Sequence, residues 1–236
     1  MRILVATALG LASFSSFAAD DYREVRQLDL AAEGARQLTI ETGAGSLDVR
    51  GVEGQDTITV RATIVVENAD EEEGRAFIEQ RVRIGFDREG DTVRLVTDVQ
   101  QSGLRWGSEG RVDVEVTAPP ALALHIDDGS GSIDIADFIA DVVVEDGSGS
   151  IDMHNMGSVT IDDGSGSIDV FNASGDVFVN DGSGSITIEG VGGTVTIDDG
   201  SGSIRVRKVD QDLIIIDAGS GSVSFSDVKG TVEQDG

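Results

Sequence analysis

A five-residue phrase that returns every 17 to 19 residues constrains this chain more than any other feature. The phrase is Asp-Gly-Ser-Gly-Ser followed by an apolar, a polar and an apolar residue, and it first stands in full at residues 128–135. Its first glycine occurs at Gly129, Gly147, Gly164, Gly182, Gly200 and Gly219. A weaker copy occupies residues 42–49. An internal repeat of this length predicts structural units that stack in a row.

Each repeat predicts two short strands joined by the Gly-Ser turn. In one unit, Val159 and Ile161 alternate with polar residues before the turn, and Ile168 and Val170 alternate with polar residues after it. Residues two apart share one face of a strand, so each strand has an inner apolar side. Two such strands cannot bury both inner faces alone, but stacked coils can. We therefore expect an all-β, single-domain β-solenoid with coils of about 18 residues.

The N-terminal half carries a different pattern and is expected to close one end of the stack. Residues 38–52 repeat the alternation of the later units and predict a first rung, and longer strands follow. Three glutamates after Asp70 predict one short helix over residues 70–80, although Gly74 weakens that prediction. The expected organisation is thus residues 1–19 as a signal peptide, residues 20–120 as a β-rich cap region with the first rung, and residues 121–236 as the solenoid repeats.

The first 19 residues have the layout of a secretory leader. Arg2 precedes an apolar run, and the segment ends in small residues at positions 15–19 ahead of two aspartates. This layout predicts an exported protein, located in the periplasm, at the cell surface or outside the cell. No later apolar run reaches the length of a membrane span, so no transmembrane segment is expected. The chain has no cysteine, and its core or bound ions must therefore hold it together.

The charge of the chain restricts its partners. The formal net charge is −27, and residues 121–236 carry only four Lys or Arg against 22 Asp or Glu. Nucleic acids and anionic lipids require a positive surface, so neither is an expected partner. Cations, basic proteins and neutral glycans remain. We therefore expect a protein or a glycan partner at the cell envelope and no nucleic acid.

The order of these motifs resembles a known family. An alternating strand, then Pro119-Pro120, then repeated Gly-Ser-Gly-Ser-apolar-x-apolar, is similar to the bacterial "putative adhesin" β-solenoid domains, which are exported and of unknown function. The resemblance extends over residues 38–228. It implies a β-solenoid fold and export, and its name points to adhesion. The family supplies no catalytic residues to carry over to this chain.

The residues immediately before the turn glycines form a column of carboxylates. The column consists of Asp128, Asp146, Asp163, Asp181 and Asp199, with Ala218 at the sixth position. Carboxylates about 5 Å apart repel by somewhat under 1 kcal/mol in water and by more in a less polar medium, so something must offset the repulsion.

Two interpretations of this column are open. Each Asp can accept backbone N–H groups of its own turn, or Ca²⁺ can lie between rungs with oxygen ligands. The turn role is preferred, because calcium-binding nine-residue repeats carry a Gly-Asp phrase on both sides of the coil and this chain carries it on one. No cofactor is expected, and Ca²⁺ is the exception left open.

A second column is unusually apolar for an exposed surface. The outward positions of the first strand in each rung are expected to be Val143, Thr160, Phe178, Thr196 and Ile215, preceded by His125. Single exposed apolar residues are ordinary, whereas a contiguous stripe is typical of a face that binds a partner or another copy. These residues are the candidate partner stripe.

Catalysis finds little support in the sequence. Gly-Ser-Gly-Ser lies between two strands and differs from the Gly-x-Ser-x-Gly turn that presents a nucleophile. The two histidines, His125 and His154, fall in different rungs and on different strands, which does not suit a triad or a histidine metal site. We therefore expect no enzyme, and predict an exported β-solenoid for surface interaction, adhesion or envelope scaffolding. The alternative is a Ca²⁺-dependent solenoid that uses the Asp-Gly-Ser-Gly turns.

The last residues predict a partial rung with an unpaired strand edge. Residues 231–235 would begin the next coil, and only a few charged side chains would guard that edge. Unpaired edges invite pairing with another chain. End-to-end self-association through the C-terminal rung, or fraying of that rung, is therefore expected.

Overall fold

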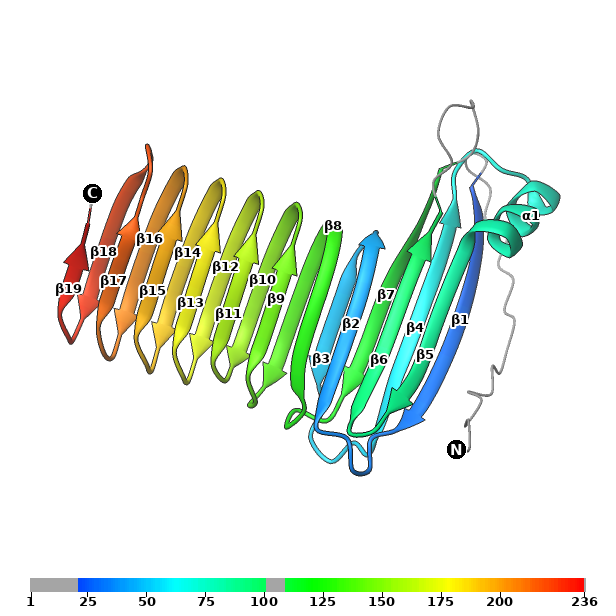
Figure 1. Cartoon of the computed structure of the whole chain (residues 1–236), viewed down its shortest axis with the longest axis horizontal. Helices are drawn as coiled ribbons and strands as arrows, with labels where there is room; N and C mark the ends of the chain where they lie inside the picture. The colour runs from blue at the N-terminus through cyan, green and yellow to red at the C-terminus, as the bar shows by residue number, and fades with distance from the viewer. Residues whose placement is uncertain (1–20, 101–108, 236) are drawn as a thin grey trace.

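The computed structural model describes residues 21–100 and 109–235 and is an elongated β-solenoid with a β-rich cap at one end (Figure 1). The all-β prediction is confirmed: 19 strands and one helix are found in these two ranges. The predicted signal peptide, residues 1–19, lies outside the described residues. In residues 21–100 and 109–235, no helix is both long enough and apolar enough to cross a membrane.

Two sheets face each other along the whole stack. Each rung contributes one strand to the first sheet, then the Asp-Gly-Ser-Gly turn, then one strand to the second sheet. The long strand β8 (Ala123–Phe138) belongs to both sheets. The later strands of the first sheet are β9 (Val142–Asp146), β11 (Val159–Asp163), β13 (Val177–Asp181), β15 (Val195–Asp199), β17 (Leu213–Asp217) and β19 (Val232–Gln234). Those of the second sheet are β10 (Gly149–Met156), β12 (Gly166–Ala173), β14 (Gly184–Val191), β16 (Gly202–Val209) and β18 (Ser222–Val228).

Parallel pairing in register converts the sequence repeat into columns of like residues. Ile168 pairs with Ile151 on one side and with Ile186 on the other, and all three are fully buried. The inner residues form one continuous hydrophobic cluster that extends from Ala32 in the cap to Ile215 in the last full rung. The alternation that predicted this core is confirmed for the central rungs.

The last full rung departs from the predicted register. Ile215, expected in the outward stripe, pairs with Ile197 and is only 1% exposed, whereas Ile214 pairs with Thr196 and takes the outward place. The cause is an irregularity before the turn, where Asp198 pairs with Asp217 and Ile216 has no counterpart in β15. Counting back from the turn glycine therefore shifts the assignment by one residue, and Ile215 is not part of the exposed stripe.

The cap extends both sheets with strands that come from a different part of the chain. The first rung, β2 (Gln37–Ala44) and β3 (Leu47–Gly51), pairs with β8 on one side, and on the other with β6 (Thr92–Val99) and β7 (Gly110–Ala118). Antiparallel strands then complete the cap: β5 (Val82–Glu89) beside β6, β4 (Thr57–Val66) beside β7, and β1 (Tyr22–Ala31) beside β4. This rung lies between strands that follow it in sequence.

The single helix, α1 (Glu71–Arg81), packs at the end of the cap (Figure 1). Asp70 caps it by accepting the N–H groups of Glu72 and Glu73, and Glu73 reaches back to the Asp70 backbone, which is the reciprocal capping box. Gly74, the residue that weakened the prediction, is buried against the side chain of Tyr22 in β1, which leaves no room for a Cβ. The helix is therefore stabilised by its N-cap and by close contact with β1.

The final strands are the least buried part of the described solenoid. Phe225 pairs with Val206 of the inner column, yet it is 47% exposed, and Val232 is 39% exposed. Within the described residues β18 pairs with β16 on one edge only. End-to-end association through this rung stays a prediction.

The core assignment predicts opposite effects for two adjacent residues. Ile168→Asp places an unpaired charge in the fully buried column and should cost more than about 4 kcal/mol of unfolding free energy. Asp169→Ser, on the outer face, should change it by less than about 0.5 kcal/mol. Chemical unfolding followed by circular dichroism measures both. Similar losses in the two variants would contradict the register.

The turn glycines predict a second contrast. At Gly166 the backbone has φ +152°, and a Cβ would collide with the carbonyl oxygen of Gly149 in the rung before, so Gly166→Ala should separate adjacent rungs and cost several kcal/mol. Gly85→Ala is the control, because a Cβ there has no neighbour within 4 Å. We expect a large fall in melting temperature for the first variant and no fall for the second. A tolerated Gly166→Ala would contradict the close approach.

Candidate functional site

The turn aspartates come together as one buried column along an edge of the stack. Asp128, Asp146, Asp163, Asp181 and Asp199, here called the aspartate column, pair in register from rung to rung. The later four are the last residues of their strands, Asp128 lies within β8, and all five are buried, with between 0% and 7% exposed. Buried carboxylates are unusual unless they are paired or hydrogen-bonded. Their surroundings therefore decide what the column can do.

One oxygen of each later carboxylate organises its own turn. The Oδ1 atoms of Asp146, Asp163, Asp181 and Asp199 accept the backbone N–H two residues on, from Ser148 at 3.2 Å, Ser165 at 3.0 Å, Ser183 at 3.0 Å and Ser201 at 2.9 Å. This is the geometry by which Asp stabilises a turn. The preferred interpretation of the sequence, that these residues form turns, is confirmed for the four.

Uncharged residues bound the column at both ends. In the first rung, Thr42 stands beside Asp128 and donates its hydroxyl to Asp128 Oδ1 at 2.6 Å. At the other end, Ala218 follows Asp217 in the position that an aspartate occupies in the earlier rungs. The column is therefore a closed set of five carboxyls between a neutral donor and an aliphatic side chain.

The second oxygen of each carboxyl has no partner. The Oδ2 atoms of all five column residues are buried and accept no hydrogen bond from the described residues. Burial raises the pKa of Asp181 to about 6; the Ser183 N–H opposes this rise, and the neighbours Asp163 and Asp199 add to it. Burial is also the main cause that raises the pKa of the other four carboxyls. The environment thus disfavours the ionised form throughout the column.

The repulsion within a fully ionised column would be substantial. With a rung spacing of about 4.8 Å, adjacent charges at an effective dielectric constant of about 20 repel by roughly 3 kcal/mol. The serine N–H on each of the four later carboxylates, and the Thr42 hydroxyl on Asp128, compensate only part of this. Full ionisation of five stacked carboxyls therefore opposes the fold.

The number of ligands limits what cation the column can hold. Ca²⁺ takes six to eight oxygen ligands. Within residues 21–100 and 109–235, no three His, Cys, Asp or Glu side chains are arranged to hold a metal ion. The Oδ1 atoms of the four later residues are already engaged by the turns. The arrangement favours the turn role, and calcium binding by these five residues gains no support from it.

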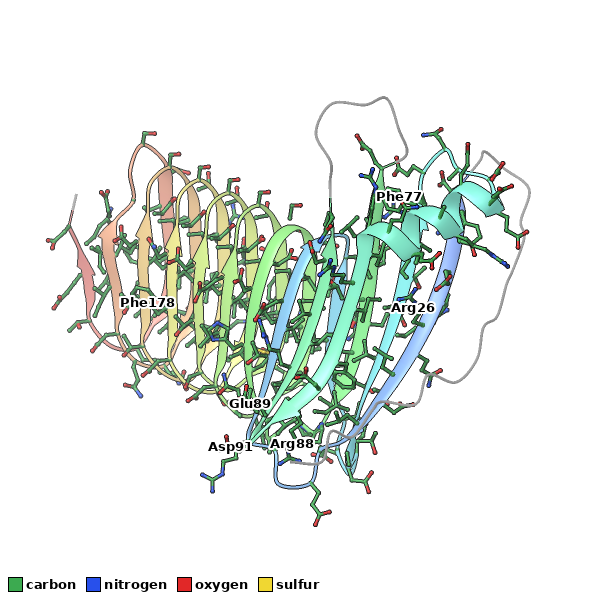
Figure 2. All side chains as sticks on the ribbon, turned by 45° about the vertical axis from the view of Figure 1, so that its right-hand side comes forward. Arg26, Phe77, Arg88, Glu89, Asp91 and Phe178 are labelled. Atoms are coloured by element: carbon green, nitrogen blue, oxygen red, sulfur yellow. The ribbon has the colours of Figure 1, made fainter. Side chains whose placement is uncertain are left out.

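The outward column of the first sheet forms a surface stripe that is exposed at Thr160 and Phe178 and half-buried at its other three positions. Val143, Thr160, Phe178, Thr196 and Ile214, here called the outer stripe, pair in register across five rungs. Phe178 at the centre is 40% exposed, and Figure 2 shows it on the solenoid half of the molecule. The structure therefore brings together four of the five predicted stripe residues and replaces Ile215 by Ile214.

Acidic side chains line both margins of the outer stripe. On the turn side stand four acidic residues and one neutral amide, one per rung: Asp127, Glu145, Asp162, Asn180 and Asp198. Two contacts order this margin: Asn180 Nδ2 donates to Asp162 Oδ1 at 3.1 Å, and Glu145 Oε1 lies 3.6 Å from His125 Nε2. On the other side, Asp176 and Asp212 accept backbone N–H groups at 2.8 and 2.7 Å. The stripe is thus a narrow apolar surface between two negative margins.

The outer face of the second sheet carries an aromatic pair that sequence reasoning missed. His154 and Phe171 occupy paired positions of β10 and β12, and their rings stack with centroids 5.1 Å apart and planes 10° from parallel. The neighbouring Asp152 has a raised pKa, first because of burial and then because of Asp169 and Asp134. A spacing of 17 residues, one repeat, is the signal that could have identified the pair.

Solved structures with a similar shape bear the name that the sequence resemblance suggested. A "putative cell adhesion protein" from Clostridium sporogenes is 13% identical, with a TM-score of 0.43, and the match covers 92% of this chain and all of that one. A "putative adhesin" from Bacteroides fragilis is 12% identical, with a TM-score of 0.36 and coverage of 89% and 97%. Another from Parabacteroides merdae is 14% identical, with a TM-score of 0.31 and coverage of 90% and 96%. Likenesses this distant do not assign a function.

Comparisons by sequence add no relatives. No family model and no curated protein matches this chain.

The small number of oxygen ligands in the aspartate column predicts how divalent cations will change the melting temperature. Millimolar CaCl₂ and MgCl₂, compared at equal ionic strength, should raise the melting temperature by the same modest amount, because both screen the net charge of −27. After dialysis, adding a chelator should leave the melting temperature unchanged. Differential scanning calorimetry measures these shifts. A rise specific to Ca²⁺ that disappears in the double variant Asp163→Asn, Asp181→Asn would contradict the turn role and support a calcium site.

Proposed function

We propose that this protein is an exported, non-catalytic β-solenoid that binds a partner at the bacterial cell envelope, in adhesion or in envelope scaffolding. The observation that carries the proposal is the outer stripe, in which Phe178 stands among smaller side chains on a flat sheet. An exposed apolar surface with a polar margin is typical of an interaction site. Export rests on the leader expected in residues 1–19, and the periplasm and the cell surface both fit it.

The rigidity of the stack supports a binding role. Every strand that carries the outer stripe is hydrogen-bonded to the strand before it and to the strand after it. The side chains of the stripe therefore hold a fixed spacing before any partner arrives, and little backbone order is lost on binding. An aromatic anchor with smaller neighbours is the usual form of an energetic hot spot. Phe178 is the residue on which binding should depend.

The charge of the margins favours one class of partner. Acidic side chains on both sides of the outer stripe repel acidic surfaces and attract basic ones. A protein that presents an apolar centre with Lys or Arg around it fits this surface best. A neutral glycan that stacks on the phenylalanine ring would tolerate the margins without using them. The proposal therefore favours a basic protein partner over a glycan.

The distribution of reactive side chains fits binding better than catalysis. His125 lies in β8 on the first sheet and His154 in β10 on the second, and each contacts a neighbour on the outside of the rod. The turn aspartates repeat the same geometry in successive rungs. An active site is normally a single specialised place, whereas this arrangement repeats. The protein acts by presenting a surface.

A pair of matched substitutions tests the proposal. Phe178→Ser should weaken binding to an envelope fraction of the source bacterium about 30-fold, the effect of losing a hot spot of about 2 kcal/mol. Phe171→Ser, the same change one rung earlier on the opposite sheet, should leave binding unchanged. A photoreactive residue at position 178 then captures the partner, and mass spectrometry together with a glycan panel identifies its class. Biolayer interferometry measures both affinities.

Two results would contradict the proposal, one from the binding assay and one from cell fractionation. Equal loss of binding in the two variants, with melting temperatures unchanged, would mean that the outer stripe is not the interface. Fractionation that places the tagged protein in the cytoplasm with an uncleaved N-terminus would contradict the claim that the protein is exported.

A further inference from the structure

The five unpaired oxygens of the aspartate column are the feature of the molecule that turn formation leaves unexplained. A turn requires only Oδ1, and Oδ1 is the atom that the serine N–H groups reach. The Oδ2 atoms remain buried and unpartnered in every rung of the column. One unpaired Oδ2 atom could arise by chance, but an unpaired Oδ2 atom in five successive rungs is a property of the repeat. Something other than the described protein groups must satisfy these oxygens.

Protonation is the simplest way to give these Oδ2 atoms a hydrogen-bond partner. A protonated carboxyl gains an O–H donor, and the carboxyl of the next rung is the acceptor nearest along the column. Such a hydrogen bond needs two oxygens and no further ligand, and O–H···O contacts of about 2.5 to 3.0 Å can form between side chains on strands about 4.8 Å apart. A divalent cation would need several more oxygen ligands, and no group of three suitable side chains is found within the described ranges.

We propose that the aspartate column is a proton-sharing ladder, in which buried carboxyls retain protons in mildly acidic surroundings, where an exposed aspartate is ionised, and donate them from one rung to the next. The ladder makes the stack of rungs more stable in mildly acidic surroundings and less stable in alkaline ones. It lies inside the rod, so it is independent of the outer stripe and of the partner proposed for that stripe.

The groups around the column do not supply a counter-charge. The charged neighbours that act on it are acidic: Asp127 beside Asp128, Asp162 beside Asp163, and both Asp198 and Asp217 around Asp199. From β2 the column meets the hydroxyl of Thr42. On the second sheet, each strand after the turn begins with glycine and serine, which do not titrate in this range. None of these elements supplies a positive charge, and burial outweighs the hydrogen bonds from Thr42 and the turn N–H groups, which favour ionisation.

The direction of the pH dependence follows from these shifts. The folded-state pKa of each column carboxyl is raised above its ordinary value near 3.8, to about 6 for Asp181. Folding therefore binds protons, and the stabilisation is fully present below about pH 4 and is lost as the pH rises through the raised folded-state pKa of each carboxyl, about 6 for Asp181. Glu41, Glu189 and Asp212 act in the opposite sense, because their pKa values are lowered by Arg94, by Lys208 and by the Thr231 backbone respectively. These three are half-buried, and their stabilisation is lost only at lower pH.

Asparagine mimics the protonated aspartic acid and gives the sharpest test. In Asp163→Asn the Oδ1 acceptor for Ser165 remains, and an NH₂ group replaces the orphan oxygen, as an O–H would. This variant should resist unfolding better than the natural protein at pH 7.5 and equal it at pH 4.5. Asp162→Asn is the matched control, since it removes the same formal charge one residue earlier on the outer face. It should leave the pH dependence unchanged.

The measurement is urea unfolding of the full chain between pH 4.5 and 8 at constant ionic strength. For every proton that folding binds, the unfolding equilibrium constant should rise tenfold per pH unit. We expect this slope in the natural protein and in Asp162→Asn, and a slope smaller by more than half in the double variant Asp163→Asn, Asp181→Asn. Carbon-detected NMR of the Asp carboxyls should show the Asp181 resonance titrating near pH 6 and the other column resonances titrating above the usual range of aspartate.

Three results would overturn the proposal. The first is an equal slope in the double variant and in Asp162→Asn, which would assign the pH dependence to the net surface charge. The second is loss of folding in Asp163→Asn at pH 7.5, which would mean that the column requires the ionised carboxylate. The third is a slope that disappears in CaCl₂ but persists in MgCl₂, which would assign the orphan oxygens to calcium.

Discussion

The parallel hydrogen-bond ladder between rungs is the interaction on which the rest of this structure depends. It fixes each rung directly above the previous one, as when Gly147 N–H reaches the carbonyl of Asp128 and Gly164 N–H reaches that of Asp146. In-register pairing forces every position of the repeat to face its own copies. Isoleucine then meets isoleucine, which buries apolar area without mismatch, and glycine meets glycine where the backbones approach most closely.

The same ladder places carboxyls above carboxyls, which the apolar columns do not explain. The repeat tolerates this because a single residue serves two purposes: Asp163 closes its turn with one oxygen and leaves the other inside the stack. A serine could close a turn of this kind without a charge. The use of aspartate in five rungs therefore concentrates ionisable groups inside a rod whose outside is already strongly acidic. The outer stripe shows the favourable side of the same rule, since repetition also gathers apolar side chains on the surface.

The sequence predicted the features that neighbouring residues determine, and it missed those that depend on how strands pair and sheets pack. Alternation around the turn was sufficient to identify the inner column of Ile168, and the Asp70 capping signal identified α1. Ile215 was misplaced because a one-residue irregularity next to the turn changes the register without changing the pattern of apolar residues. The turn role of Asp163 is local and was predicted, whereas its buried second oxygen depends on how the sheets pack. The His154–Phe171 pair was missed because its two residues are far apart in sequence and meet only through register.

The placement of the first rung determines the order in which the chain can assemble. Pairs within the solenoid join residues that are one repeat apart, whereas the contact between Thr42 and Asp128 joins residues 86 apart. Strands β2 and β3 fill both their edges only after β6, β7 and β8 have been synthesised. Closing so long a loop is the costly step, and each later rung adds to an existing template by closing a short one. We therefore expect the cap and the first rung to close slowly, and the later rungs, whose contacts are one repeat apart, to add quickly to an existing edge.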